Sequence, residues 1–239
     1  MKRVIGAVAG VGVLLWTLGM GYADWRRYVW TYEYETMPKN SAELEYYVTF
    51  EEPNLHRSAT NTWKHWLELE YGLTDNWDIS MYQMFQQNNL PAGSNFEYAG
   101  FKVRSRYKIG KRGQFPVDPL LYLEYERDDT SHEPNVIEGK VVLAKDIGKF
   151  NIAYNQIFEM PIEHDALLEH QYAVGVNYQI FPNCALGVES KGNFTKDKYY
   201  IGPTIGFLTS RLWVSAGVLR GISKKADDVQ ARMIVGIPF

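Results

Sequence analysis

After residue 23 the sequence has no run of about 18 apolar residues, which is the length that a transmembrane helix requires. It contains a single cysteine, Cys184, so no disulfide can form within the chain. Basic residues are not in excess either, because 25 Lys and Arg stand against 28 Asp and Glu, for a net charge of −3. These absences exclude a helical membrane span and an internal disulfide, and they argue against a nucleic-acid partner.

The first 23 residues have the pattern of a secretory signal peptide. Lys2 and Arg3 form a short positive region, residues 4–18 are almost wholly apolar, and Gly21 and Ala23 put small residues before a cleavage site at Asp24. The alternative, a single membrane-spanning helix, needs a longer apolar stretch. The residue directly after the cleavage site is not a cysteine, so the chain is not a lipoprotein of the usual kind. An exported chain with strand patterning is either a soluble β protein or a barrel of the Gram-negative outer membrane.

Alternation of apolar and polar residues is clearest in two stretches, and this period of two predicts strands. In 97–109 the apolar face carries Ala99, Phe101, Val103, Tyr107 and Ile109, and the other face carries Lys102, Arg104, Arg106 and Lys108. In 230–239 one face carries Ala231, Met233, Val235, Ile237 and Phe239. Further strands are predicted at about 28–36, 42–50, 63–71, 77–86, 119–126, 136–146, 149–158, 169–180, 184–191, 198–208 and 212–220. Several have about ten residues, the length of a tilted transmembrane strand.

The connections between these strands alternate between short and long. Short turns are predicted at 72–76, 147–149, 181–184 and 209–211, and longer polar segments at 51–61, 87–95, 127–135, 159–168, 192–197 and 221–228. Outer-membrane barrels have this rhythm because their periplasmic turns are tight and their extracellular loops are long. Such barrels have an even number of strands, and thirteen candidate strands are one too many for a barrel of twelve. We therefore expect twelve strands within 41–239, and a preceding segment, 24–40, that is periplasmic, lumenal or an extra strand.

The signal peptide, the strand and turn from Glu68 to Asp75, and the terminal Val235 to Phe239 together resemble bacterial outer-membrane β-barrels of the porin-like superfamily. The resemblance covers nearly all of the mature chain and implies an all-β, antiparallel, up-and-down transmembrane barrel of about twelve strands in the cell outer membrane. It implies contacts with outer-membrane lipids and lipopolysaccharide. It also implies that Phe239 belongs to the signal read by the barrel-assembly machinery. It brings no catalytic residues and no cofactor.

Charged residues are predicted to line the lumen: Lys102, Arg104, Arg106, Lys108, Glu68, Glu70, Glu124, Glu126, Glu138 and Lys140. One interpretation is an anion-selecting constriction built on Arg104 and Arg106. The other, which the surplus of acids around the basic ladder favours, is a salt-bridge network that fills and rigidifies a narrow barrel. Because 97–109 and 119–126 are consecutive strands, we expect Arg104 and Arg106 to face Glu124 and Glu126. The predicted function is passive, porin-like passage of small solutes, or a structural role if the lumen is plugged.

A lipid-modifying enzyme of the hydrolase or acyltransferase type is the alternative function, since some outer-membrane barrels are lipid hydrolases. That chemistry needs a nucleophile, a base and an orienting group. The sequence has no Gly-x-Ser-x-Gly, and its five histidines are dispersed, so we expect no enzyme. Loop clusters around His132 and His164 contain hard metal ligands without defined spacing, and no metal site is predicted from them.

Overall fold

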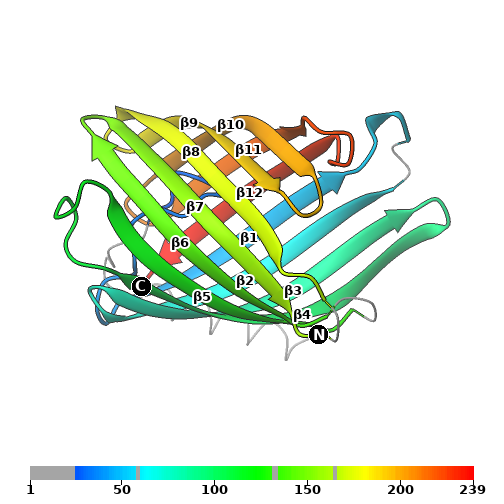
Figure 1. Cartoon of the computed structure of the whole chain (residues 1–239), viewed down its shortest axis with the longest axis horizontal. Helices are drawn as coiled ribbons and strands as arrows, with labels where there is room; N and C mark the ends of the chain where they lie inside the picture. Colours follow the sequence, from blue (N-terminus) through cyan, green and yellow to red (C-terminus); the bar gives the residue numbers. More distant parts are fainter. Residues whose placement is uncertain (1–24, 58–59, 131–133, 164–165) are drawn as a thin grey trace, which may run out of the picture.

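The computed structural model describes residues 25–57, 60–130, 134–163 and 166–239, and these form a closed barrel of twelve strands. Each strand pairs antiparallel with its sequence neighbours, and β1 closes the ring by pairing with β12 (Figure 1). The strands are β1 (Ala42–Glu52), β2 (Asn61–Thr74), β3 (Trp77–Leu90), β4 (Gly93–Lys108), β5 (Asp118–Asp128), β6 (Val136–Ile147), β7 (Phe150–Pro161), β8 (Glu169–Phe181), β9 (Cys184–Asn193), β10 (Lys198–Leu208), β11 (Trp213–Gly221) and β12 (Val229–Pro238). The predicted up-and-down topology and strand number are confirmed. Within the described ranges, no helix is long and apolar enough to cross a membrane.

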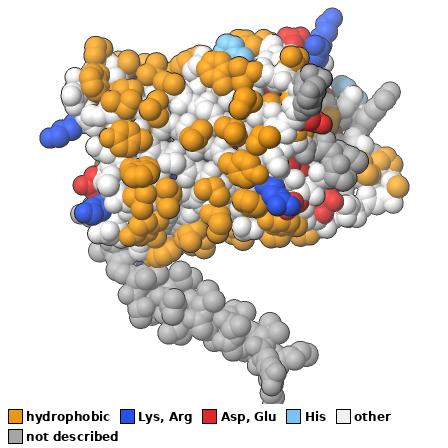
Figure 2. Space-filling model, turned by 60° about the horizontal axis from the view of Figure 1, so that its bottom comes forward, with side chains coloured by type: hydrophobic (Ala, Val, Ile, Leu, Met, Phe, Trp, Pro, Cys, Tyr) orange, Lys and Arg blue, Asp and Glu red, His pale blue; other side chains and the backbone are white. Residues whose placement is uncertain are grey.

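Alternate residues of each strand point outward and inward, which gives the barrel an apolar outer surface. On β4, Val103 is 47% exposed whereas its neighbour Arg104 is 1% exposed. Figure 2 shows hydrophobic side chains over the middle of the wall, with most charged side chains toward its two ends. The wall can therefore face lipid while its charges face the lumen.

The alternation slips within β4, where the sequence prediction was wrong. Opposite Met84 and Phe85 of β3, strand β4 contains one extra residue, and Gly100 in this bulge adopts a φ of +123°. A bulge adds one residue to a strand and so reverses which face the preceding residues occupy. Ala99 consequently packs inside the barrel, and Tyr98 and Phe96 are exposed on the outside.

The long and short connections occupy opposite ends of the barrel, except that two residues, 91–92, join β3 to β4 at the long-loop end and nine, 109–117, join β4 to β5 at the short-turn end. Two residues join β6 to β7 and two join β8 to β9, while the seven residues 222–228 join β11 to β12. The predicted loop at 87–95 is wrong, because β3 continues to Leu90 and β4 begins at Gly93. This hairpin of β3 and β4 has the longest strands of the barrel (Figure 1).

Residues 25–41, which precede β1, run inside the barrel and form no regular element before residue 42. The alternation at 28–36 therefore does not produce a strand, although Tyr28, Trp30, Tyr34 and Met37 are buried. Of the three placements considered for this stretch, the structure has the lumenal one. The predicted signal peptide, residues 1–23, lies outside the described residues.

Candidate functional site

The lumenal segment, defined as residues 25–37, is held in place by hydrogen bonds between its backbone groups and side chains of the barrel wall. The Glu189 carboxylate on β9 accepts hydrogen bonds from the amides of Val29 at 2.8 Å, Trp30 at 2.9 Å and Thr31 at 2.7 Å. Asn155 on β7 binds both backbone groups of Tyr32, at 2.6 Å to the amide and 2.9 Å to the carbonyl. Buried backbone groups need such partners, so these two side chains replace the ladder that the segment does not make.

The segment enters and leaves at the short-turn end. The Tyr28 hydroxyl donates to the Asn151 carbonyl at 2.8 Å near the start of β7, and the Met37 amide donates to Asp78 at 3.0 Å near the start of β3. Between these points the chain rises to the level of Glu189 and returns. The lumenal segment therefore closes the lumen in its short-turn half.

Ion pairs form within the lumenal segment and between the segment and the short-turn rim of the barrel. Arg27 bonds Glu33 at 2.7 Å through Nε. Burial lowers the pKa of the Arg27 guanidinium, but the attraction of Glu33 and Asp146 outweighs it, so that pKa is raised overall. Arg112, from the connection between β4 and β5, reaches Glu35 of the segment and Asp146 of β6. Arg112 thus links the segment to two neighbouring parts of the short-turn rim.

The predicted basic ladder does face inward, but its two arginines are engaged. Arg104 Nη2 lies 2.8 Å from Glu68 and 2.6 Å from Glu70, and Arg106 Nη2 pairs with Glu70 and lies 2.7 Å from Asp78. All of these side chains are at most 3% exposed. Arginines neutralised in this way do not present an anion-selecting constriction, so the geometry is that of a salt-bridge network that fills the barrel on the side of β2 to β4.

The remaining predicted lumen residues also point inward. Lys102 lies 3.0 Å from Glu124 and 2.5 Å from Glu126, and Lys140 lies 2.7 Å from Glu138. Lys108 has its Nζ 5.8 Å from the ring of Tyr34 in the lumenal segment.

Arg104 lies opposite Glu124 as expected, but the expectation that Arg106 also faces an acid of β5 is wrong. Antiparallel pairing of β4 and β5 puts Lys102 opposite Glu126, Arg104 opposite Glu124, and Arg106 opposite Tyr122. The acids that hold the arginines lie on the other side of β4, on β2 and β3, and Glu124 binds Lys102 instead.

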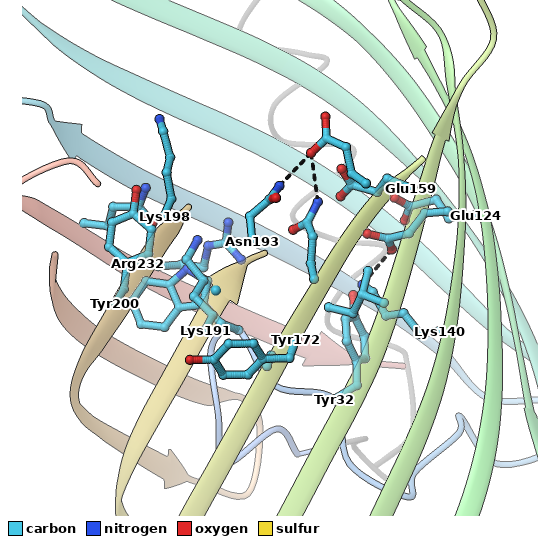
Figure 3. A pocket seen from close by; sticks show the side chains of 18 of the residues that line it. Tyr32, Glu124, Lys140, Glu159, Tyr172, Lys191, Asn193, Lys198, Tyr200 and Arg232 are labelled. Atoms are coloured by element: carbon cyan, nitrogen blue, oxygen red, sulfur yellow. Dashed lines mark hydrogen bonds and ion pairs between the residues drawn. The ribbon is translucent and has the colours of Figure 1, made fainter. Parts of the chain in front are cut away.

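Above the lumenal segment, the long-loop half of the lumen contains a cavity of about 410 Å³. We call it the vestibule. Its floor includes Arg26, Trp30 and Tyr32, and its lining carries eight basic and six acidic side chains. Figure 3 shows the two sides: Lys191, Lys198, Tyr200 and Arg232 lie on one, and Glu124, Lys140 and Glu159 lie on the other.

Tyr32 reports the electrostatics of the vestibule floor. Cationic side chains lie over its ring: Arg26 Cζ is 4.4 Å and Lys140 Nζ is 4.6 Å from the ring centre. Burial raises the pKa of the Tyr32 phenol, but attraction by Arg26, Arg104 and Lys140 outweighs burial, so the pKa is lowered overall. Several cationic side chains therefore converge on the Tyr32 ring at the floor.

Several residues that shape this site were not predicted. Glu189 and Lys191 on β9 are far in sequence from Arg232 on β12, and only the closed ring brings Lys191 and Arg232 to one cavity. Glycines within strands were a usable signal, because Gly206 and Gly217 lie where the lumenal segment touches the wall. A Cβ atom at Gly217 would meet Trp30 and Val29 side-chain atoms at 2.8 Å.

Histidine chemistry is sparse in the described part of the chain. His65 accepts or donates a 2.7 Å hydrogen bond with the Tyr46 hydroxyl on the exposed outer face. Among the described residues no group of three or more His, Cys, Asp and Glu is arranged to hold a metal ion. His132, Glu133, His164 and Asp165, which the loop clusters included, lie outside the described residues.

No protein-family model matches this sequence, and no curated protein matches it. Solved structures do match. An outer membrane channel from Pseudomonas putida F1 superposes with a TM-score of 0.64 at 10% identity, over 89% of this chain and 100% of the channel. The KdgM porin gives a TM-score of 0.59 at 11% identity, over 82% of this chain and 99% of the porin. The NanC porin gives 0.57 at 12% identity, over 81% and 98%. At such identities the likeness concerns the fold, and by fold this chain is a porin-like, twelve-stranded β-barrel of the outer-membrane type.

Proposed function

We propose that this barrel is a narrow channel for small polar solutes and that the lumenal segment is its closing element. The observation that carries the proposal is the position of residues 25–37, which fill the short-turn half of the lumen while the vestibule stays hollow above them. A barrel with only a structural role has no need of a hollow, charge-lined half.

The anchoring of the segment supports a low conductance at rest. Its apex depends on three backbone hydrogen bonds to one carboxylate and two to one amide side chain. Hydrogen bonds to a charged group are worth about 1.5–3 kcal/mol each, so displacement of the apex is an infrequent event. Solutes would then pass when the segment moves, and most of the time the barrel would be closed.

The lining of the vestibule favours polar, and in particular anionic, solutes. It carries two more basic than acidic side chains, although the whole chain has a net charge of −3. A barrel of similar fold, the KdgM porin, has been solved in complex with disordered oligogalacturonate, with a TM-score of 0.54 to this chain.

A disulfide that locks the segment to the wall tests the closing role. In a Cys184→Ser background, Val29→Cys and Gly217→Cys would join the segment to β11, because a Cβ at Gly217 lies 2.8 Å from Val29 Cγ2 and such proximity suits a disulfide. Conductance in planar bilayers is then recorded under oxidising and reducing conditions. A Cβ at position 217 also crowds Trp30 and Thr204, so the matched control is Gly217→Cys alone, which carries the same crowding without the lock.

We expect the double variant to open more often when reduced than when oxidised, and the control to show no such difference. Equal currents in both states would show that the segment does not close the pathway. The barrel is not a channel if current is absent in all three cases: in the reduced variant, under applied voltage, and after deletion of residues 25–37.

We also propose that the chain has no lipid hydrolase or acyltransferase activity. The same refolded sample, incubated with phospholipid vesicles, tests this. Release of fatty acid above that of a heat-denatured control would contradict it.

A further inference from the structure

One arginine of the vestibule lies near two tryptophan rings. The guanidinium carbon of Arg232 on β12 lies 5.6 Å from the ring centre of Trp30 and 5.3 Å from that of Trp66. Its Nε donates to Thr49 Oγ1 at 2.8 Å, and its Nη1 donates to the Val29 carbonyl at 3.2 Å. Both partners are neutral, so within the described residues Arg232 has no carboxylate at ion-pair distance.

A second cation lies beside it with the same lack of a counter-ion. Lys191 Nζ on β9 is 5.7 Å from the Trp30 ring centre and 5.3 Å from that of Tyr200, and among the described residues it forms no ion pair. Two acidic side chains of the lining act on it from a distance, and both have other partners: Lys64 lies 3.0 Å from Glu51, and Gln230 donates to Asp227 at 2.8 Å. Partly buried charges are usually paired. Here two adjacent cations face the vestibule without an acidic side chain at ion-pair distance among the described residues.

The hydrogen bonds of Arg232 fix the position of its head group. Because Nε and one N–H of Nη1 are used within the protein, the edge formed by the remaining N–H groups of Nη1 and Nη2 can donate to the two oxygens of a carboxylate. A spherical anion gains less from that edge. The other side of the vestibule carries Glu159, whose carboxylate can accept hydrogen bonds from hydroxyl groups and would repel a second acid, and Glu124, which Lys102 already engages (Figure 3).

We infer that Arg232 and Lys191 form a binding subsite for a small hydroxylated monocarboxylate, with the carboxylate on the Arg232 edge and the hydroxyl groups toward the acidic side. The inference rests on the proposed function only in that the vestibule is taken to be reached by solutes. Trp30 belongs to the lumenal segment and Arg232 to the wall, so the segment completes this subsite as well as closing the lumen below it.

Equilibrium binding to the refolded barrel in detergent micelles tests the subsite without any transport step. The probes are D-glucuronate and, as the uncharged counterpart with the same ring, D-glucose. Binding is followed by isothermal titration calorimetry and by tryptophan fluorescence, since two indoles flank the site. The variants are Arg232→Gln, Arg232→Lys and Lys191→Gln. The matched control is Arg211→Gln, an exposed arginine on the connection between β10 and β11 at the opposite end.

We expect glucuronate to bind the unmodified barrel at least about tenfold more tightly than glucose, and Arg232→Gln to weaken glucuronate by about tenfold or more. Arg232→Lys should restore the charge but not the preference for carboxylate over chloride, measured by competition. Lys191→Gln should weaken binding less, and Arg211→Gln should leave it unchanged.

The subsite is wrong if glucuronate and glucose bind alike, if neither binds, or if Arg232→Gln and Arg211→Gln behave alike. Heat-modifiable migration on gels shows whether each variant is folded, and Arg232→Lys serves where Arg232→Gln is not. Absence of conductance together with intact glucuronate binding would refute the channel and leave the subsite standing. Conductance without glucuronate binding would refute the subsite and leave the channel standing.

Discussion

Glu70→Gln is the substitution that should reveal most about the buried network. Glu70 is fully buried and shared by two guanidiniums, Arg104 at 2.6 Å and Arg106. Replacing its carboxylate with an amide leaves two buried cations with one fewer counter-charge. Removing one partner of a buried ion pair typically costs about 3–5 kcal/mol.

The remaining contacts place this variant at the lower end of that range. Arg104 keeps Glu68 at 2.8 Å, and Arg106 keeps Asp78 at 2.7 Å. We therefore expect Glu70→Gln to lower the free energy of unfolding by about 3 kcal/mol. The double variant with Arg106→Gln should be less damaging than the sum of the two single changes, because it removes the orphaned cation together with its partner.

The measurement is equilibrium unfolding by urea of the barrel in phospholipid vesicles, followed by tryptophan fluorescence. The matched control is Glu126→Gln, the same chemical change on a side chain that is 27% exposed and whose partner Lys102 retains Glu124. Glu126→Gln should lower the free energy of unfolding by about 0.2–1 kcal/mol. Equal destabilisation by Glu70→Gln and Glu126→Gln, or strict additivity of Glu70→Gln and Arg106→Gln, would refute the shared, water-excluded network.

Three further predictions concern the wall, the seam and the lumenal segment. Val103→Arg, on the exposed outer face, should lower the free energy of unfolding in vesicles by about 2–4 kcal/mol. The control Ser80→Ala, at an inward position, should change that free energy far less. Deleting Phe239, whose backbone pairs with Ala42 across the seam, should reduce the amount of heat-modifiable barrel in the outer membrane, and normal assembly would count against its role. Glu189→Gln should speed hydrogen exchange at the amides of 29–31 by about tenfold or more, measured by mass spectrometry, because the carboxylate holds all of them. Unchanged exchange there would show that these bonds do not hold the apex.

The barrel could be predicted from the sequence because each strand repeats one local rule. Alternation decides which residues face lipid, and turn length decides the direction of the chain. Both are properties of short stretches, so the twelve strands from 42 onward and the inward ladder on β4 follow from them. The rule fails at Ala99, because a one-residue bulge at Gly100 is decided by pairing with β3 and leaves no periodic trace in β4.

The candidate site was predicted in part. Alternation shows that Arg104 and Glu70 face the lumen, but not that they meet, because the register across β2, β3 and β4 depends on the whole hairpin. Alternation at 28–36 was also ambiguous, since buried tyrosines in an irregular lumenal segment produce the same pattern as a strand. The pairing of Arg232 with Trp30 and Trp66 joins three distant stretches of chain, and no local pattern could indicate it.

The lumen is filled in two different ways on its two sides, and this asymmetry explains where the segment and the subsite lie. On β2 to β5 the inward side chains are large and charged, and they neutralise one another across the strands. On β8, β10 and β11 many inward residues are small: Ala173, Gly175, Thr204, Gly206, Ser215 and Gly217. The segment approaches the second kind of wall most closely, because a Cβ at Gly175 or Gly217 would already collide with Tyr28 or Trp30. The acids of the lumen are mostly consumed by the first kind of wall, so the cations beside the segment, Lys191 and Arg232, are left facing the vestibule without a protein counter-ion.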